Sequence, residues 1–213
     1  MILGSADDWT GHFKRHDERL LERICEILPD CIAAMPENPL EDDITINLID
    51  RFHLDAVIRR LFHHWQYQFE PFGHDENGVA FSKGKIDFVV CWDQNREKYL
   101  AYEAKRLNVT TKSGSTSSLA TAYVTEGLVR FVTEQYSEGL PVGCMLGYVL
   151  DGNVGSVKPK IEKAVADNSE LVGLLAGPDD LPAIASATRL TSDHERENSG
   201  GNITVRHALV PCC

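Results

Sequence analysis

The chain has 213 residues, 43% of them hydrophobic and 25% charged, with a formal net charge of −11. This length and composition predict one globular domain over residues 1–213 with a full core. They exclude a membrane protein, because no apolar run approaches the roughly 20 residues of a membrane helix; the missing signal-peptide pattern and the six scattered cysteines favour the cytoplasm.

The first part of the chain is predicted to be helical and then to change to strands. Residues 13–28 have the pattern of a charged amphipathic helix that ends at Pro29. A long helix is expected from Pro39 toward Trp65, with Asn38 as its cap. Aliphatic and aromatic runs separated by turn residues then predict three strands, over residues 66–72, 84–92 and 99–107.

The second half begins with a polar loop rich in serine and threonine. A helix, a strand of small and apolar residues and a further helix are expected after it. The predicted elements are the loop 109–118, the helix 119–137, the strand 142–150, helices over 158–168 and 169–175, the loop 177–182 and a last strand over 203–210.

Two of these strands carry a set of charged residues. Asp87 lies in the strand 84–92, and Glu103 and Lys105 lie in the next strand, after a polar turn. Side chains alternate along a strand, so Glu103 and Lys105 share one face, about 7 Å apart, and Asp87 can face them. Two converging carboxylates would bind a hard cation such as Mg²⁺ or Mn²⁺, and the lysine can then hold a water or stabilise a developing negative charge. A solvent-facing set of cross-strand ion pairs is the alternative.

An aspartate, a hairpin and then Glu-x-Lys resemble the motif of the PD-(D/E)XK nuclease superfamily, with Ile86-Asp87 in place of Pro-Asp. The predicted order of helix, three strands, helix and strand over about residues 39–151 resembles the αβββαβ core of its restriction-endonuclease-like fold. The resemblance implies an α/β protein with a mixed central sheet flanked by helices, plus an N-terminal helix and a C-terminal extension. It also implies Mg²⁺-dependent hydrolysis of DNA, with Asp87 and Glu103 as metal ligands and Lys105 orienting the attacking water.

The resemblance also suggests a third carboxylate on the first core helix, and Glu41 is the candidate metal ligand there. Its alternative is structural, because Asn38-x-x-Glu41 is a capping-box pattern. Against this, Glu41 shares a helical face with Ile44 and Leu48, which turns it inward. Glu70, on the strand after the long helix, is the substitute.

Five further residues are auxiliary candidates with plain structural alternatives. Lys83 and Lys85 flank Asp87 and could contact phosphates, although lysines near strand edges commonly prevent aggregation. Tyr123 and Arg130 share a face of the helix 119–137, where Arg130 could stabilise a phosphate oxyanion. Gln135 is an auxiliary candidate on similar grounds.

The net charge of −11 is unfavourable for binding a polyanion. It predicts that a basic surface is confined to one face, or that a second copy or a partner subunit supplies nucleic-acid binding. The function expected is a DNA endonuclease of restriction or antiviral defence, by family analogy alone. RNA is an open alternative substrate, and a non-catalytic nucleic-acid-binding or scaffold subunit that keeps the fold is the alternative function.

Other site chemistries have less support in the sequence. Pairs such as His63-His64 lack the cysteine pair that would complete a zinc site, and no Gly-x-Ser-x-Gly motif marks a serine hydrolase. His194 and Arg196 could reach a phosphate, but an exposed polar loop is the simpler interpretation of both.

Overall fold

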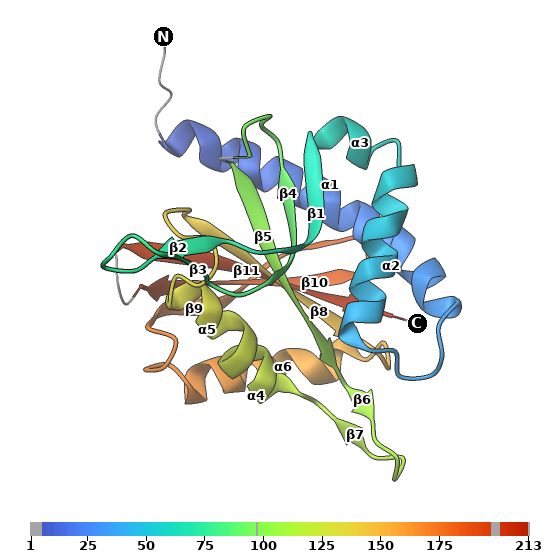
Figure 1. The fold of residues 1–213 in the computed structure, drawn as a ribbon. Coiled ribbons are helices and arrows are strands. Elements are labelled where there is room, and N and C mark those ends of the chain that lie inside the picture. Colours follow the sequence, from blue (N-terminus) through green and yellow to red (C-terminus); the bar gives the residue numbers. More distant parts are fainter. Residues whose placement is uncertain (1–5, 97, 197–200, 213) are drawn as a thin grey trace.

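The computed structural model describes residues 6–96, 98–196 and 201–212, with side chains from residue 16 onward. Its fold is mixed α/β, with helices on both faces of a central sheet of seven strands in the order β1-β4-β5-β8-β11-β10-β9 (Figure 1). The sheet strands are β1 (His64–Phe69), β4 (Ile86–Cys91), β5 (Tyr99–Leu107), β8 (Val142–Val149), β9 (Leu174–Ile184), β10 (Ala187–Glu195) and β11 (Asn202–Pro211).

The remaining elements are helices and two small hairpins. The helices are α1 (Ala6–Ala33), α2 (Glu41–Leu54), α3 (Ile58–Leu61), α4 (Ala120–Ala122), the π-helix η1 (Tyr123–Leu128), α5 (Val129–Val132) and α6 (Val154–Asp167). The hairpins pair β2 (Phe72–His74) with β3 (Ala80–Ser82), and β6 (Val109–Thr110) with β7 (Thr116–Ser117).

The sheet is mixed, and its parallel part lies at the centre. β5, β8 and β11 run parallel to one another, whereas β1, β4 and β5 pair antiparallel on one side and β11, β10 and β9 on the other. Every residue of β8 is buried. This burial is expected for a parallel strand, because crossover helices cover both faces of such a sheet.

Two hydrophobic cores lie on opposite faces of this sheet. One packs α1, α2 and α3 against the even-numbered side chains of β4 and β5, including the stacked rings of Phe88 and Tyr102, whose centroids are 4.6 Å apart. The other packs α4, η1, α5 and α6 against the opposite face. Glu103 points to this second side, because it alternates with Tyr102 along β5.

The helices differ from the prediction mainly at their ends. α1 continues through Pro29 to Ala33. The long second helix ends at Leu54, and α3 follows as a separate turn. The helix predicted over 119–137 ends at Val132 and contains a π-helical segment, and the predicted loop 109–118 contains the β6–β7 hairpin.

The C-terminal third contains more sheet than the sequence predicted. Residues 177–182 lie in β9 rather than in a loop, and residues 169–175 form turns and the start of β9 rather than a helix. The two prolines of this segment are the reason that a loop was predicted. β9 is an edge strand, however, and a residue without a backbone N–H is tolerated there. None of the helices in the described ranges is both long and apolar enough to cross a membrane.

Candidate active site

The side chains of Asp87 and Glu103 meet where the pairing of β4 with β5 ends. The last paired residues are Phe88 and Tyr102, so the same register would place Asp87 opposite Glu103. Instead, Asp87 Oδ2 accepts a 2.6 Å hydrogen bond from the backbone N–H of Ala104. The carboxylate of Asp87 thus accepts a backbone hydrogen bond from β5, as a carbonyl of a paired strand would, and this bond holds Asp87 beside β5.

Glu103 is fully buried and has two positively charged neighbours at one oxygen. Its Oε1 lies 2.7 Å from Lys105 Nζ and 3.0 Å from Arg130 Nη1. Its Oε2 is buried and has no hydrogen-bond partner among the described residues. An unsatisfied carboxylate oxygen in a protein interior is costly, so a cation bound at this atom would lower its free energy.

Glu41 reaches the same lysine from the start of α2. Its Oε1 accepts a 2.9 Å bond from Lys105 Nζ, and its Oε2 accepts a 3.0 Å bond from the backbone N–H of Arg106. The capping-box interpretation is therefore wrong. α2 begins at Glu41 with Leu40 as its N-cap, and the Glu41 carboxylate binds β5 instead of the helix terminus.

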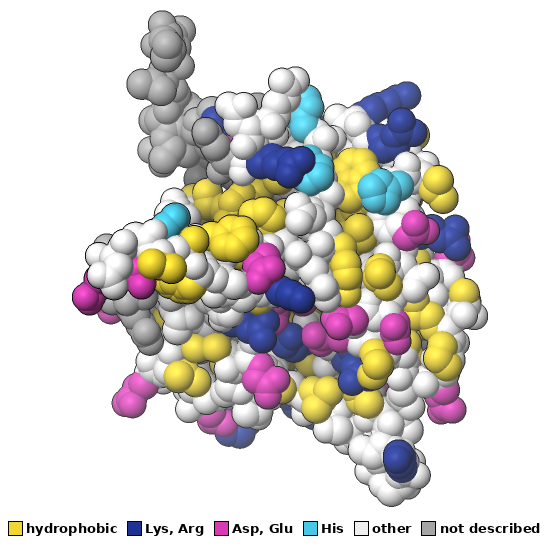
Figure 2. All heavy atoms as spheres, in the orientation of Figure 1, with side chains coloured by type: hydrophobic (Ala, Val, Ile, Leu, Met, Phe, Trp, Pro, Cys, Tyr) yellow, Lys and Arg dark blue, Asp and Glu magenta, His cyan; other side chains and the backbone are white. Residues whose placement is uncertain are grey.

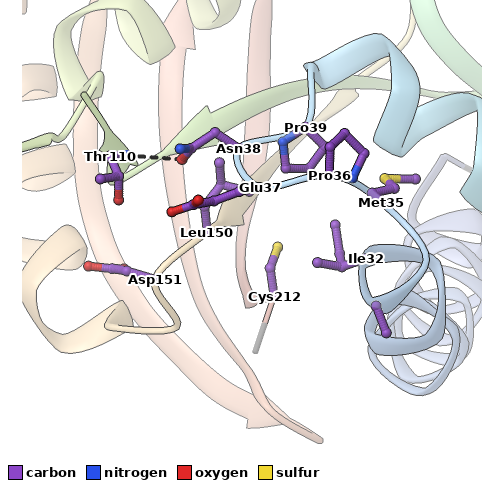
Figure 3. Close-up of a pocket in the computed structure, with 11 residues that line it drawn as sticks. Ile32, Met35, Pro36, Glu37, Asn38, Pro39, Thr110, Leu150, Asp151 and Cys212 are labelled. Carbon is purple, nitrogen blue, oxygen red and sulfur yellow. Dashed lines mark hydrogen bonds between the residues drawn. The ribbon is translucent and has the colours of Figure 1, made fainter. Parts of the chain in front are cut away.

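Asn38 does not cap α2 either, because its side chain binds a distant strand. Its Oδ1 accepts a 3.2 Å bond from the N–H of Thr110 in β6 (Figure 3). This bond ties the segment before α2 to β6, which directly follows β5, and so helps to place Glu41. The pocket in Figure 3 has a volume of about 390 Å³ and is lined by two carboxylates, Glu37 and Asp151, and a thiol, but by no histidine, lysine or arginine. It therefore offers no cation for an anionic ligand.

Burial dominates the electrostatics of the candidate site. Burial, and then the charge of Glu103, raise the pKa of Asp87 to about 8. Burial also raises the pKa of Glu103, against the opposing effect of Lys105 and Arg130. For Lys105, burial alone would lower the pKa, but Glu103 and Glu41 raise it above its ordinary value, so the side chain is an ammonium at neutral pH. Near the middle of the face in Figure 2, acidic and basic side chains lie next to one another.

The donor set at this point fits a divalent cation held by two carboxylates. Within the described residues no three His, Cys, Asp or Glu side chains are grouped as a metal site. Glu41 and Glu103 are separated by the ammonium of Lys105, which binds both. Asp87 and Glu103 are the pair that a cation would join, since burial destabilises the charged form of both and Glu103 Oε2 has no donor among the described residues.

Of the auxiliary candidates, Arg130 lies at the site and Tyr123 does not. Arg130 binds Glu103 and also the hydroxyl of Tyr136, at 2.6 Å, and its side chain is one-third exposed. Tyr123 is buried and its hydroxyl lies 3.1 Å from Nδ1 of His207, in the second core. Glu70, the substitute carboxylate, is exposed beyond the end of β1.

The remaining auxiliary candidates lie next to the site rather than in it. Lys83 forms an ion pair with Glu138. Lys85 is exposed, and its backbone carbonyl accepts a hydrogen bond from Tyr136. The amide of Gln135 lies against Gly84, where an added Cβ would be 2.1 Å from Gln135 Nε2.

Two residues interpreted as parts of an exposed loop are buried instead. His194 lies in β10, and its Nδ1 is 2.7 Å from the carbonyl of Val172. Arg196 donates to the carbonyls of Ser137 and Leu140. Both have structural roles, which the sequence could not reveal because the carbonyls that they bind are 22 to 59 residues away along the chain. Tyr136, which orients Arg130, was also missed, since its spacing from Arg130 follows no helical period.

Comparison of the chain with protein-family models, with curated proteins and with solved structures found no match.

Proposed function

We propose that this protein is a metal-dependent phosphodiesterase of the restriction-endonuclease-like fold that hydrolyses DNA. The observation that carries the proposal is the meeting of Asp87, Glu103 and Lys105 at the end of the β4–β5 pairing, with one buried oxygen of Glu103 lacking any donor among the described residues. A surface ion-pair set would leave neither carboxylate buried, so the burial of Glu103 argues against that alternative.

The arrangement of elements supports the same proposal. α2 is followed by the antiparallel strands β1, β4 and β5, and the chain then crosses through α4, η1 and α5 to β8, which is parallel to β5. This is the order of helix, three strands, helix and strand that the family resemblance implies. The β2–β3 hairpin is an insertion between β1 and β4.

The chemistry follows from what the charged residues can donate and accept. A divalent cation held by Asp87 and Glu103 would polarise a phosphoryl oxygen and make a bound water more acidic. Lys105 is an ammonium, so it cannot accept a proton; once it gives up one of its present acceptors, it can donate a hydrogen bond to the attacking water or to a phosphoryl oxygen. Arg130 is partly exposed and can donate to a second phosphoryl oxygen. Hydrolysis forms a bond from the water oxygen to phosphorus and breaks the bond to the leaving oxygen, which gains a proton as the water loses one.

The test is cleavage of plasmid and linear DNA in Mg²⁺, in Mn²⁺ and in EDTA. We expect metal-dependent cleavage by the wild type and a loss of roughly a hundredfold or more in Lys105→Ala, as for other preorganised electrostatic groups. Lys163→Ala is the matched control, because Lys163 is a surface lysine paired with Asp167 on α6. Cleavage by Lys105→Ala at the wild-type rate would refute the proposed mechanism.

A second candidate function is a non-catalytic nucleic-acid-binding or scaffold subunit. The net charge of −11 favours it. So does the engagement of Lys105, whose ammonium contacts Glu41, Glu103 and the carbonyl of Ala104 and so already has an acceptor for each of its three protons. Absence of cleavage in every metal, with and without partner proteins, would favour this function.

A further inference from the structure

The β2–β3 hairpin exposes large apolar side chains on the segment that leads into Asp87. Phe72 is 66% exposed, Val79 61% and Phe81 48%. Hydrophobic side chains gather on this hairpin in Figure 2. Exposed aromatic residues next to a candidate nuclease site have a direct use, because every nucleobase has an aromatic face that can stack on them.

The ring of Phe81 lies against the backbone of β2, because the residue opposite it has no side chain. Gly73 pairs with Phe81 across the two strands. A Cβ on Gly73 would lie 2.7 Å from Cζ of Phe81 and 2.9 Å from Cε of Lys83, so the ring and the lysine stem rest against the backbone of β2. Phe81 is thus a supported ring that is half exposed, whereas Phe72 pairs with Ser82 and points to the other face of the hairpin.

A pocket of about 350 Å³ lies between Phe81 and the turn after α5. Its walls combine an aromatic ring, polar groups and charges, contributed by Phe81, Ser82, Lys83, Thr133, Glu134, Gln135 and Glu138. The amide of Gln135 makes no hydrogen bond to any described residue, so both its donor and its acceptor are available.

The charges in this pocket favour the binding of a nucleobase over the binding of a phosphate. Lys83 is paired with Glu138, and Glu134 lies 3.9 Å from Arg196, so the two carboxylates leave no excess of positive charge. A phosphate would meet like charge there. A flat ring with N–H groups on its edge would instead stack on Phe81 and hydrogen-bond to the Gln135 amide or to a carboxylate.

The pocket is joined to the candidate active site by a short chain of contacts. Gln135 packs on Gly84, Tyr136 binds the carbonyl of Lys85, and Tyr136 also binds Arg130, which contacts Glu103. Gly84 lies three positions before Asp87 along the chain, so their Cα atoms are at most roughly 11 Å apart. The pocket and the candidate active site are therefore close enough for one nucleic-acid strand to contact both.

We infer that this pocket binds an unpaired nucleobase of the strand whose phosphate lies at Asp87 and Glu103, with Phe81 as the stacking surface and Gln135 as a hydrogen-bonding group. The inference rests on the proposed function and narrows it to nucleic acid with a single-stranded segment. Stacking does not depend on a positive surface, so it suits a chain with a net charge of −11.

The experiment measures binding without cleavage. Fluorescence anisotropy in EDTA, at one fixed salt concentration, compares a labelled 20-nucleotide oligo-dT with a labelled 20-base-pair blunt duplex. The proteins are the wild type, Phe81→Ala, Phe81→Trp and Phe72→Ala. Phe72→Ala is the matched control, because it removes an even more exposed phenylalanine from the opposite face of the same hairpin.

We expect the wild type to prefer the single strand, and Phe81→Ala to weaken that binding by roughly 5- to 150-fold, as for the loss of one stacked base. Phe81→Trp should keep the affinity and Phe72→Ala should change it less than twofold. Equal effects of Phe81→Ala and Phe72→Ala, duplex binding as tight as single-strand binding, or no binding at all would overturn the inference. If Phe81→Ala cleaves DNA as the wild type does in the presence of metal, this inference is wrong but the proposed function stands. If the protein binds the single strand through Phe81 but cleaves it in no metal, the proposed function is wrong but the pocket binds a base.

Discussion

The burial of Asp87 should make the metal-free protein less stable as the pH rises from 6.5 to 8. The pKa of Asp87 is about 8 in the folded protein and 3.8 as its ordinary value, so between these values the folded state holds a proton that the unfolded state has released. Raising the pH therefore favours unfolding. Each pH unit over which the two states differ by one bound proton is worth about 1.4 kcal/mol, so the expected loss over this window is on the order of 1–2 kcal/mol.

Other buried groups also affect stability near this window, and the comparison with Asp87→Asn separates the effect of Asp87 from theirs. Burial lowers the pKa of His207 to about 3 and also lowers that of His194, so these residues make stability rise with pH up to about 6.5, the opposite direction. The buried cysteines have pKa values raised from 9.0, and their effect begins at higher pH.

Urea unfolding in EDTA at pH 6.5 and 8.0 measures the effect, with Asp87→Asn as the comparison. The asparagine can still accept the hydrogen bond from Ala104 but carries no titrating group. The stability of Asp87→Asn should therefore fall less than that of the wild type over this range, by a difference on the order of 1–2 kcal/mol. Asp167→Asn, at an exposed position on α6, should behave like the wild type. If Asp87→Asn and the wild type lose the same stability, Asp87 is ionised in the folded protein and the account of its burial is wrong.

Three further outcomes are expected. Mg²⁺ or Mn²⁺ should raise the melting temperature of the wild type but not of Asp87→Ala, because a ligand of the folded state stabilises it by about 2.7 kcal/mol at a hundred times its Kd; an unchanged rise would remove Asp87 from the site. Lys105→Ala should bind Mn²⁺ in calorimetry as tightly as the wild type or more tightly, since a neighbouring positive charge is removed, and loss of binding would show that Lys105 shapes the metal site itself. Gly143→Ala should lower the free energy of unfolding in urea by about 1–3 kcal/mol, because its Cβ would lie 2.4 Å from the ring of Phe131, and an unchanged midpoint would show that this core can relax.

Local sequence rules were sufficient to predict that Asp87, Glu103 and Lys105 lie close together. Strand alternation and a short turn between β4 and β5 determine which side chains share a face, and neither depends on the rest of the chain. The inward direction of Glu41 was also suggested by the helical spacing of its neighbours.

The contacts that complete the candidate site could not be predicted locally. Asn38 looked like a cap because its partner, Thr110, is 72 residues away. Arg130 reaches Glu103 from a segment that includes a π-helix, which ordinary helical spacing does not describe. The burial of His194 depends on β10 pairing with β9 and β11, so the apparent loop character of that region was misleading.

The most direct test of the proposed metal site is a crystal structure of the protein grown with Mn²⁺. The account predicts an anomalous density peak between Asp87 and Glu103, about 2.1 Å from Glu103 Oε2, the oxygen without a donor among the described residues. A fully occupied peak elsewhere, or no peak while Glu103 keeps its contacts with Lys105 and Arg130, would contradict it.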